Sequence, residues 1–400
     1  MVTRVTNTML QNTLLSNLSM NLNRMDKLQN QLSSGRKFGS ISDDPSALIY
    51  GQAARNKLAR LAHYQATVET SQSWLTQAEA GLMEVNKVIG AVYEELVSAG
   101  SVKNDKDKQN LAMVVNQLRD HYVDTLNTAF GDRFVFGAYN TPGDFANGMN
   151  NDGVKPFAIR DVLNTVTGEN EPNLFFNGLN ITQFDKMSSQ LFDNMFRKIN
   201  PEGMNDDELE IALLGAGFVP GAQPPPADSS ISMVDAIRFS RLFNDRLSLD
   251  VAPGVSMPIT MNGLDLVFYT AIDENPPHGP IMRNTWNVLT DIYEGVNAIV
   301  PGTDQGTDTN ELTRMIKTAQ DAQNHVLTRA AEIGGRQRRL ELLEARFSQD
   351  NLNYEQMRSD AEDADMAEVI MFLKMSETVY QAALSAGARV IQPTLMDFLR

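Results

Sequence analysis

Hydrophobic residues recur at helical spacing over two long stretches of this chain. In the first, from Pro45 to about Ser98, one seven-residue register is occupied throughout, by Leu61, Val68, Leu75, Leu82, Ile89 and Leu96. A complementary register holds Tyr64, Ser71, Ala78, Val85 and Val92. A seven-residue apolar repeat favours coiled-coil-like packing. The stretch is therefore predicted to be one helix on the order of 80 Å long, since about fifty residues rise roughly 1.5 Å each.

The same repeat returns in the last quarter of the chain. Its main register is Leu312, Ala319, Val326, Ile333, Leu340, Phe347, Tyr354 and Ala361. The residues between the two repeats bring the chain back, so the two long helices are expected to lie side by side and antiparallel. A shorter helix is predicted after the first repeat and is expected to end at Gly131. Its apolar stripe is Leu111, Val115, Leu118, Tyr122 and Ala129.

Each end of the chain carries one further amphipathic helix. The N-terminal stripe consists of Leu15, Leu18, Leu22, Met25 and Leu32. The C-terminal helix is predicted from about Asp365 to Ile391, and its stripe includes Met366, Val369, Leu373, Tyr380 and Leu384. The long helices already bury each other, so the terminal helices have little left to cover within the chain. We therefore predict that these ten residues pack against other copies of the chain.

A short break separates the N-terminal helix from the long helix that follows it. Gly35 can adopt positive φ just past the last turn, which is a common way to end a helix. Asp44 stands where an N-cap oxygen is needed, and Pro45 falls at the first helical position, where its missing N–H has no partner to lose. The break therefore ends one helix and starts another.

Between about residues 142 and 302 the helical spacing is lost, and Gly, Pro and Asn become frequent. Two Asn-Gly pairs, Asn177-Gly178 and Asn262-Gly263, each separate apolar runs and predict type I′ hairpin turns. Strands are also predicted over 133–139 and 247–251, whereas 236–243 fits either a strand or a helix.

The same region contains two predicted helices and two predicted loops. One helix covers 204–214 with Asn205 as its cap, and the other covers 287–300. The loops lie at 224–230 and 275–280, where prolines cluster. The fold class predicted is mainly α, with long antiparallel coiled-coil-like helices from both ends and an inserted β-rich (α+β) domain. The predicted domains are 1–141, 142–302 and 303–400.

Composition narrows the possible functions. The formal charge of the 400 residues is −16, which disfavours binding to a phosphate backbone, so no nucleic-acid partner is expected. The absence of Cys excludes disulfides and thiolate metal sites. No apolar run approaches the length of a transmembrane helix, and the N-terminus lacks the pattern of a cleavable secretory signal. No membrane partner is therefore expected.

Residues suited to catalysis are scattered. The four histidines, His63, His121, His278 and His325, lie far apart, and no metal-binding or nucleophile motif is present. The acids at 206–208 fit the first turn of a helix, and Glu362, Asp363 and Asp365 are expected to be solvated or to cap a helix. We predict no catalytic residues, no cofactor and no metal site.

Two short motifs near the ends resemble the signatures of the flagellin superfamily. The first is Leu32-Ser33-Ser34-Gly35 followed by Asp43-Asp44, and the second is Glu362-Asp363-Ala364-Asp365 followed by the stripe through Tyr380 to the closing Arg400. Within the superfamily the chain is most similar to the junction proteins that join hook to filament. Pro45 stands where flagellins usually carry Ala-Ala-Gly, and 132–139 and 263–268 resemble segments of the junction family.

The resemblance implies a structural protein of the bacterial flagellum, exported by the flagellar type III system and located outside the cell. It also implies four partners: the first hook-associated protein, flagellin, further copies in a ring, and an export chaperone. The sequence leaves two alternatives open. A filament flagellin shares nearly every feature, and a cytoplasmic coiled-coil scaffold would account for the repeats alone.

Overall fold

The computed structural model describes residues 7–40, 44–98, 105–131, 133–137, 155–163, 170–219, 231–272, 280–298 and 306–390. The chain forms two compact units, one made of Met1–Gln65 with Ala345–Arg400 and the other of Ala66–Glu344. The predicted domain boundaries at 141/142 and 302/303 lie outside the described residues. The predicted loop at 224–230 and most of the one at 275–280 also lie outside them.

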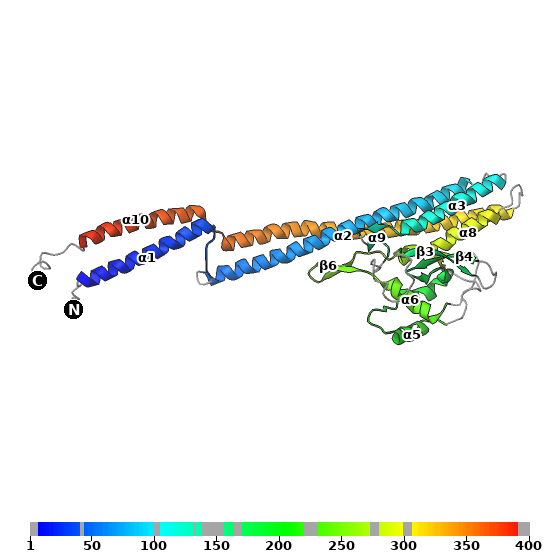
Figure 1. The fold of residues 1–400 in the computed structure, drawn as a ribbon, viewed down its shortest axis with the longest axis horizontal. Coiled ribbons are helices and arrows are strands. Elements are labelled where there is room, and N and C mark those ends of the chain that lie inside the picture. The colour runs from blue at the N-terminus through cyan, green and yellow to red at the C-terminus, as the bar shows by residue number, and fades with distance from the viewer. Residues whose placement is uncertain are drawn as a thin grey trace, which may run out of the picture. The chain divides into compact units, whose positions relative to one another are not determined.

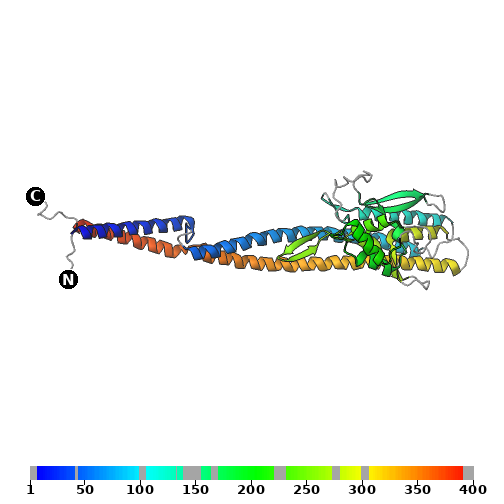
Figure 2. The same ribbon diagram turned by 90° about the horizontal axis from the view of Figure 1, so that it is seen from below.

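The first unit is helical. It contains α1 (Asn7–Ser34), the start of α2 (Pro45–Ser98), the end of α9 (Gly306–Glu362), and α10 (Met366–Val390). Here α2 and α9 run antiparallel, as predicted. The Tyr64 ring stacks on Phe347 with centroids 6.3 Å apart, and Lys57 Nζ lies 5.1 Å from the Tyr354 ring centroid. Figures 1 and 2 show α1 and α10 side by side.

The second unit packs the rest of α2 and α9 with α3 (Asp105–Leu126) and α8 (Thr285–Ala298). The predicted seven-residue registers form its core. Fully buried members include Leu75, Leu82, Ile89, Leu96, Ile333 and Leu340. Polar side chains mark the edge of this seam, where Gln72 Nε2 donates to Glu344 at 2.9 Å and Gln337 Nε2 donates to Glu79 at 3.0 Å. The prediction of an antiparallel helical core is confirmed.

The third helix ends earlier than predicted, at Leu126 instead of Gly131. The Asn127 side chain explains this end. Its amide donates to the Phe157 carbonyl and its oxygen accepts from the Phe157 N–H, both at 2.9 Å, so it pairs with a strand. Beyond it, Gly131 takes φ +58° in the turn between β1 (Ala129–Phe130) and β2 (Arg133–Phe134). The strand predicted over 133–139 is present only as the two residues of β2. Residues 138 and 139 lie outside the described ranges.

The first predicted Asn-Gly hairpin is confirmed. β3 (Phe157–Leu163), β4 (Asn170–Phe176) and β5 (Leu179–Asn180) form an antiparallel sheet in that order. Asn177 and Gly178 connect β4 to β5 with φ of 47° and 78°, as a type I′ turn requires.

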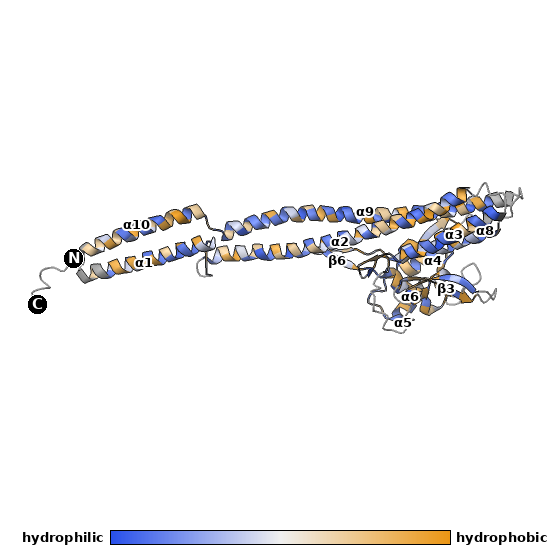
Figure 3. Ribbon diagram, turned by 45° about the horizontal axis from the view of Figure 1, so that its top comes forward, coloured by the Kyte–Doolittle hydropathy of each residue, from blue (hydrophilic) through white to orange (hydrophobic). Residues whose placement is uncertain are grey.

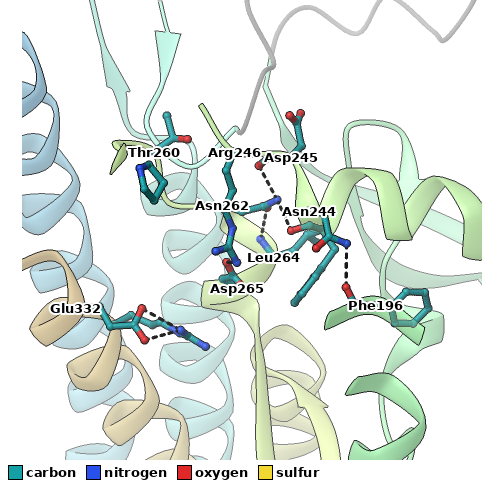
Figure 4. Close-up of polar contacts among 12 residues, drawn as sticks. Phe196, Asn244, Asp245, Arg246, Thr260, Asn262, Leu264, Asp265 and Glu332 are labelled. Atoms are coloured by element: carbon teal, nitrogen blue, oxygen red, sulfur yellow. Dashed lines mark hydrogen bonds and ion pairs between the residues drawn. The ribbon is translucent and has the colours of Figure 1, made fainter. Parts of the chain in front are cut away.

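The second Asn-Gly prediction is wrong, because Asn262 caps a helix. Its φ is −73°, its Oδ1 accepts the Leu264 N–H at 2.9 Å, and α7 (Gly263–Val267) begins directly after it. Its amide group donates to three main-chain oxygens at the end of α6, those of Leu242, Phe243 and Asp245 (Figure 4). The main chain at position 263 packs so closely against Phe136 that only glycine fits, since a Cβ there would lie 2.7 Å from the Phe136 carbonyl oxygen.

The remaining elements complete the insert. The ambiguous segment is helical, as α6 (Met233–Asn244), and β6 (Ser248–Ala252) pairs with β7 (Val255–Pro258). β8 (Phe268–Ile272) pairs with β9 (Pro280–Asn284). α5 (Asp206–Gly215) starts with the predicted Asn205 cap, as a capping box closed by Glu208. Short helical turns lie at Thr182–Phe184, α4 (Ser189–Phe192) and Asp193–Arg197.

Six phenylalanines form the core of the insert, centred on Phe239. The ring centroid of Phe239 lies 4.1 Å from that of Phe184, 4.7 Å from that of Phe196 and 5.4 Å from that of Phe268. Phe192 and Phe243 also contact it, and all six side chains are buried. Aromatic burial on this scale makes the cluster the main apolar core of the β-containing region.

His325 is half-buried where α9 meets this region, and its Nε2 lies 2.8 Å from the Asp265 carbonyl oxygen. Burial lowers the pKa of His325 from 6.5 to about 4. His325 therefore becomes protonated below about pH 6.5 in the unfolded chain, but only below about pH 4 in the folded chain. We expect this residue to remove up to about 3 kcal/mol of stability as the pH falls from 6.5 to 4.

The measurement is urea unfolding of the wild-type chain and of His325→Gln at pH 7 and pH 4. Burial raises the pKa of Asp265, which adds stability as the pH falls, so only the difference between the two proteins isolates His325. A difference that does not change between the two pH values would show that His325 has the same pKa in the folded and unfolded chains.

Candidate assembly site at the chain ends

The two end motifs meet in the first unit, although one follows α1 and the other follows α9. The Ala364 N–H donates to the Gly35 carbonyl at 2.9 Å, and the Lys37 N–H donates to the Glu362 carbonyl at 2.7 Å. Arg36 and Asp363 pair as an antiparallel bridge. Backbone hydrogen bonds therefore join the two breaks.

Ser33, Ser34 and Gly35 shape the first break. Both serine hydroxyls donate to the Asn30 carbonyl, at 3.0 and 2.7 Å, and satisfy an oxygen of the last helical turn. Gly35 then adopts φ +69° and ends α1, as predicted. A side chain at this φ is strained, so glycine is the residue that turns the chain toward Ala364.

Glu362 corrects the expectation of a solvated acid, because it is buried at the end of α9. Its carboxylate accepts from Arg55 of α2, whose Nε lies 3.1 Å from Oε2. Gly51 makes room for it one helical turn earlier, since a Cβ there would lie 2.5 Å from Oε1. Glu362 therefore links α2, α9 and the first break.

The aspartates at the two helix starts are caps. Asp44 Oδ1 accepts from the N–H groups of Ser46 and Ala47 at 3.1 and 3.0 Å, as predicted. Hydrogen bonds from the Ala47 N–H and the Ser46 hydroxyl lower the pKa of Asp44. Asp365 Oδ1 accepts from the Ala367 N–H at 2.9 Å and starts α10. Asp363 is exposed, and Asp43 lies outside the described residues.

Glu362→Gln is expected to lower the free energy of unfolding by about 1–3 kcal/mol. The amide keeps the shape of the carboxylate but loses the charge that holds Arg55, which is itself partly exposed and can be hydrated. Thermal unfolding followed by circular dichroism measures the effect. Glu341→Gln removes an exposed pair with Arg338 and should change stability by less than about 0.5 kcal/mol. Equal effects of the two substitutions would contradict the role given to Glu362.

α1 and α10 pack against each other, which corrects the premise that they have little to cover within the chain. Leu28 and Val369 are buried, and Asn21 Nδ2 donates to the Ser376 carbonyl at 3.0 Å. Gly387 faces Leu14 so closely that an added Cβ would lie 2.7 Å from Leu14 Cδ2. One face of each helix is therefore already used.

This pairing divides the ten predicted packing residues. Val369 is buried between the helices, and Leu18, Met25, Leu32, Leu373 and Tyr380 are half-buried. The other four are exposed: Leu15, Leu22, Met366 and Leu384. Five of the contact residues named above were missing from the prediction: Leu14, Asn21, Leu28, Ser376 and Gly387. A seven-residue register through Leu14, Leu18, Asn21, Met25, Leu28 and Leu32 would have found the first three.

Large apolar side chains also remain exposed on the helix pair. We call them together the outer apolar face: Met9, Leu15, Met20, Leu22, Ile370, Met371, Met375, Val379 and Leu384, all exposed. On α10, the exposed fractions of Met371 and Val379 are 58% and 53%. Figure 3 shows apolar residues along the whole of α10. A helix that carries apolar side chains beyond the face it already buries commonly packs them against a further partner.

The exposed apolar side chains of α1 and α10 are suited to packing against other helices. Among the described residues, no group of three metal-ligating side chains comes together, and no helix is long and apolar enough to cross a membrane.

Comparison with known proteins finds a family match in the first third of the chain. Residues 5–141 match the family model of the bacterial flagellin N-terminal helical region. The match includes α1, the break with Ser33, Ser34 and Gly35, and all of α2 and α3. It agrees with the resemblance carried by the N-terminal motif, whereas the C-terminal motif lies outside the matched residues.

Two curated relatives each match part of the chain. One is the flagellar hook-associated protein 3 of Salmonella typhimurium, 32% identical over 139 residues, which are 32% of this chain and 42% of the relative. The other is the flagellar filament 30.7 kDa core protein of Treponema maltophilum, 29% identical over 111 residues, which are 26% of this chain and 39% of the relative. The matched stretches thus span about two fifths of the curated relatives.

A solved structure of flagellar hook-associated protein 3 from Legionella pneumophila also resembles the chain. It has a TM-score of 0.40 and 15% identity, and the match covers 77% of this chain and 97% of that one.

Proposed function

We propose that this chain is a structural subunit of the bacterial flagellum, located at the junction between hook and filament. The observation that carries the proposal is the outer apolar face of α1 and α10, which remains exposed after the two helices have paired. The flagellin N-terminal region and the hook-associated relative support the flagellar setting.

The proposed assembly is a ring. Copies pack through their outer apolar faces, with the first hook-associated protein on one side and flagellin on the other. The chain reaches this place through the flagellar type III export system, with an export chaperone, and acts outside the cell. We also propose that residues 142–302 form an outer domain facing solvent.

A filament subunit is the second candidate. It is favoured by the relative named as a filament core protein, whose identity to this chain is similar to that of the hook-associated relative. Both candidates use the same packing of terminal helices, so the helices do not separate them.

Immunogold labelling of isolated flagella tests the proposal. A junction protein gives label at one position, where hook meets filament. Label along the whole filament would establish the second candidate, and absence of the chain from flagella would reject both.

A further inference from the structure

We propose that neighbouring copies contact each other through a second pair of surfaces: an acidic face of α5 on one copy and a basic face of α9 on the next. The inference rests on the proposed ring of copies and names a contact within it. Both surfaces belong to the second unit.

The acidic face consists of Asp207, Glu210, Ile211 and Leu214. These residues are spaced as i, i+3, i+4 and i+7, so they share one side of α5, and all are exposed. Ile211 is 70% exposed, the second largest fraction among the exposed large apolar residues. The opposite side of α5 buries Leu209 and Leu213 in the insert. The outward side therefore combines apolar surface with negative charge.

The basic face consists of Gly335, Arg338, Arg339 and Leu342 on α9. It has the same spacing, all four residues are exposed, and Leu342 is 61% exposed. The opposite side of α9 buries Ile333 and Leu340 in the helical core. This face therefore combines apolar surface with the positive charges of Arg339 and of Arg338, which also pairs with Glu341 of its own helix at 2.6 Å, in a chain whose net charge is −16.

Gly335 and its neighbour Gly334 give an independent reason to expect a contact here. Both lie inside α9, where glycine is less favourable than alanine. An added Cβ at either position would have no described atom of this chain within 4 Å, so internal packing does not require glycine. Glycine at these positions would let the backbone of another molecule come close to α9.

The two faces have the same spacing and opposite charge, and each carries exposed apolar side chains, two on α5 and one on α9. With the two helices aligned in the same direction, Glu210 lies opposite Arg338 and Leu214 lies opposite Leu342. The same register places Asp207 opposite Gly335 and Ile211 opposite Arg339. Within one copy, α5 lies on the side of the second unit away from α9 (Figures 1 and 3), so a neighbour supplies the partner. Different patches on the two copies make a heterologous contact, which closes into a ring when the rotation allows.

Charge reversal tests the contact. Asp207→Lys with Glu210→Lys places basic residues on both faces, and Arg338→Glu with Arg339→Glu places acidic residues on both. Each double variant is expected to lower incorporation of the chain into flagella by about tenfold, because attraction becomes repulsion. The fourfold variant, with both faces reversed, should return to the wild-type level. Failure of the fourfold variant to recover would overturn the proposal.

A crosslink tests the same contact directly, since the chain has no cysteine of its own. Leu214→Cys with Leu342→Cys in one chain should give a ladder of disulfide-linked dimers, trimers and larger species when isolated flagella are oxidised with diamide. The control pairs Leu214→Cys with Leu352→Cys, which is equally exposed on α9 but off the basic face. Absence of the ladder, or an equal ladder from the control, would reject the contact.

These outcomes separate this contact from the proposed function. Flagella that contain the chain and work normally but give no ladder would reject the contact alone. Flagella that lack the chain altogether would reject the proposed function itself.

Discussion

Leu15→Asp is expected to abolish incorporation of the chain into flagella while leaving its helical content unchanged. Leu15 is 60% exposed and lies on the outer apolar face of α1, so aspartate there remains hydrated in the isolated chain. If copies pack through this face, assembly buries the charge without a partner in every subunit. An unpaired buried charge costs several kcal/mol, on the order of 3–5, enough to prevent a repeated contact.

Leu352→Asp is the matched control. Leu352 is equally exposed, at 60%, but lies on α9 and not on the terminal helices. Its substitution should leave assembly intact. The measurement compares the chain in culture medium with the chain in isolated flagella, together with circular dichroism of both purified variants. Normal incorporation of the Leu15→Asp variant would contradict packing between copies through the outer apolar face.

Leu373→Asp is a less selective substitution, because Leu373 is half-buried beside α1. Aspartate at this position would disturb the pairing of α1 with α10 as well as the contact between copies. Met371→Asp is the appropriate test on α10, since Met371 points outward. It should behave as Leu15→Asp does.

Phe239→Ala is expected to destabilise the insert by about 3–5 kcal/mol. Phe239 is fully buried and contacts the other five rings of the cluster, so alanine leaves a cavity that no single neighbour can fill. Phe239→Leu keeps most of the volume and should cost less than about 2 kcal/mol. Urea unfolding monitored by tryptophan fluorescence compares the two, with Trp286 as a reporter in the same unit.

The destabilisation caused by Phe239→Ala is expected to be confined to the second unit. The pairing of α1 with α10 and the link from Glu362 to Arg55 lie in the first unit and should keep their stability. Similar unfolding of Phe239→Ala and the wild-type chain would show that the six rings do not form a cooperative core.

The sequence predicted the helical core well because its signal is local and repeated. Leu61, Leu75 and Ile333 each belong to a register that extends over many turns, and the structure buries all of them. The helix boundaries at Gly35 and Pro45 were also predictable, since a positive φ and an N-cap oxygen are properties of single residues.

The errors arose where a residue has two possible roles. An Asn-Gly pair favours a hairpin turn, and Asn177 makes one. Asn262 instead caps α7, because its amide group donates hydrogen bonds to three carbonyl oxygens at the end of α6. Glu362 looked like a surface acid because its partner, Arg55, is distant in the sequence. Contacts between segments that are distant in the sequence produce no periodic pattern from which they could be predicted.

The terminal stripes show the same limit. Periodicity placed Leu15 and Leu18 on one face, whereas the structure turns Leu18 toward α10 and Leu15 outward. An apolar stripe wide enough for two partners does not say which residue meets which partner. The exposed fraction of each side chain, known only from the structure, separates them.

Deletion of the gene tests the central proposal most directly. Cells are examined by negative-stain electron microscopy, and their culture medium by gel electrophoresis. A junction role predicts bare hooks and unpolymerised flagellin in the medium, because filament growth has no base on which to start. Intact filaments on the deleted cells would contradict it.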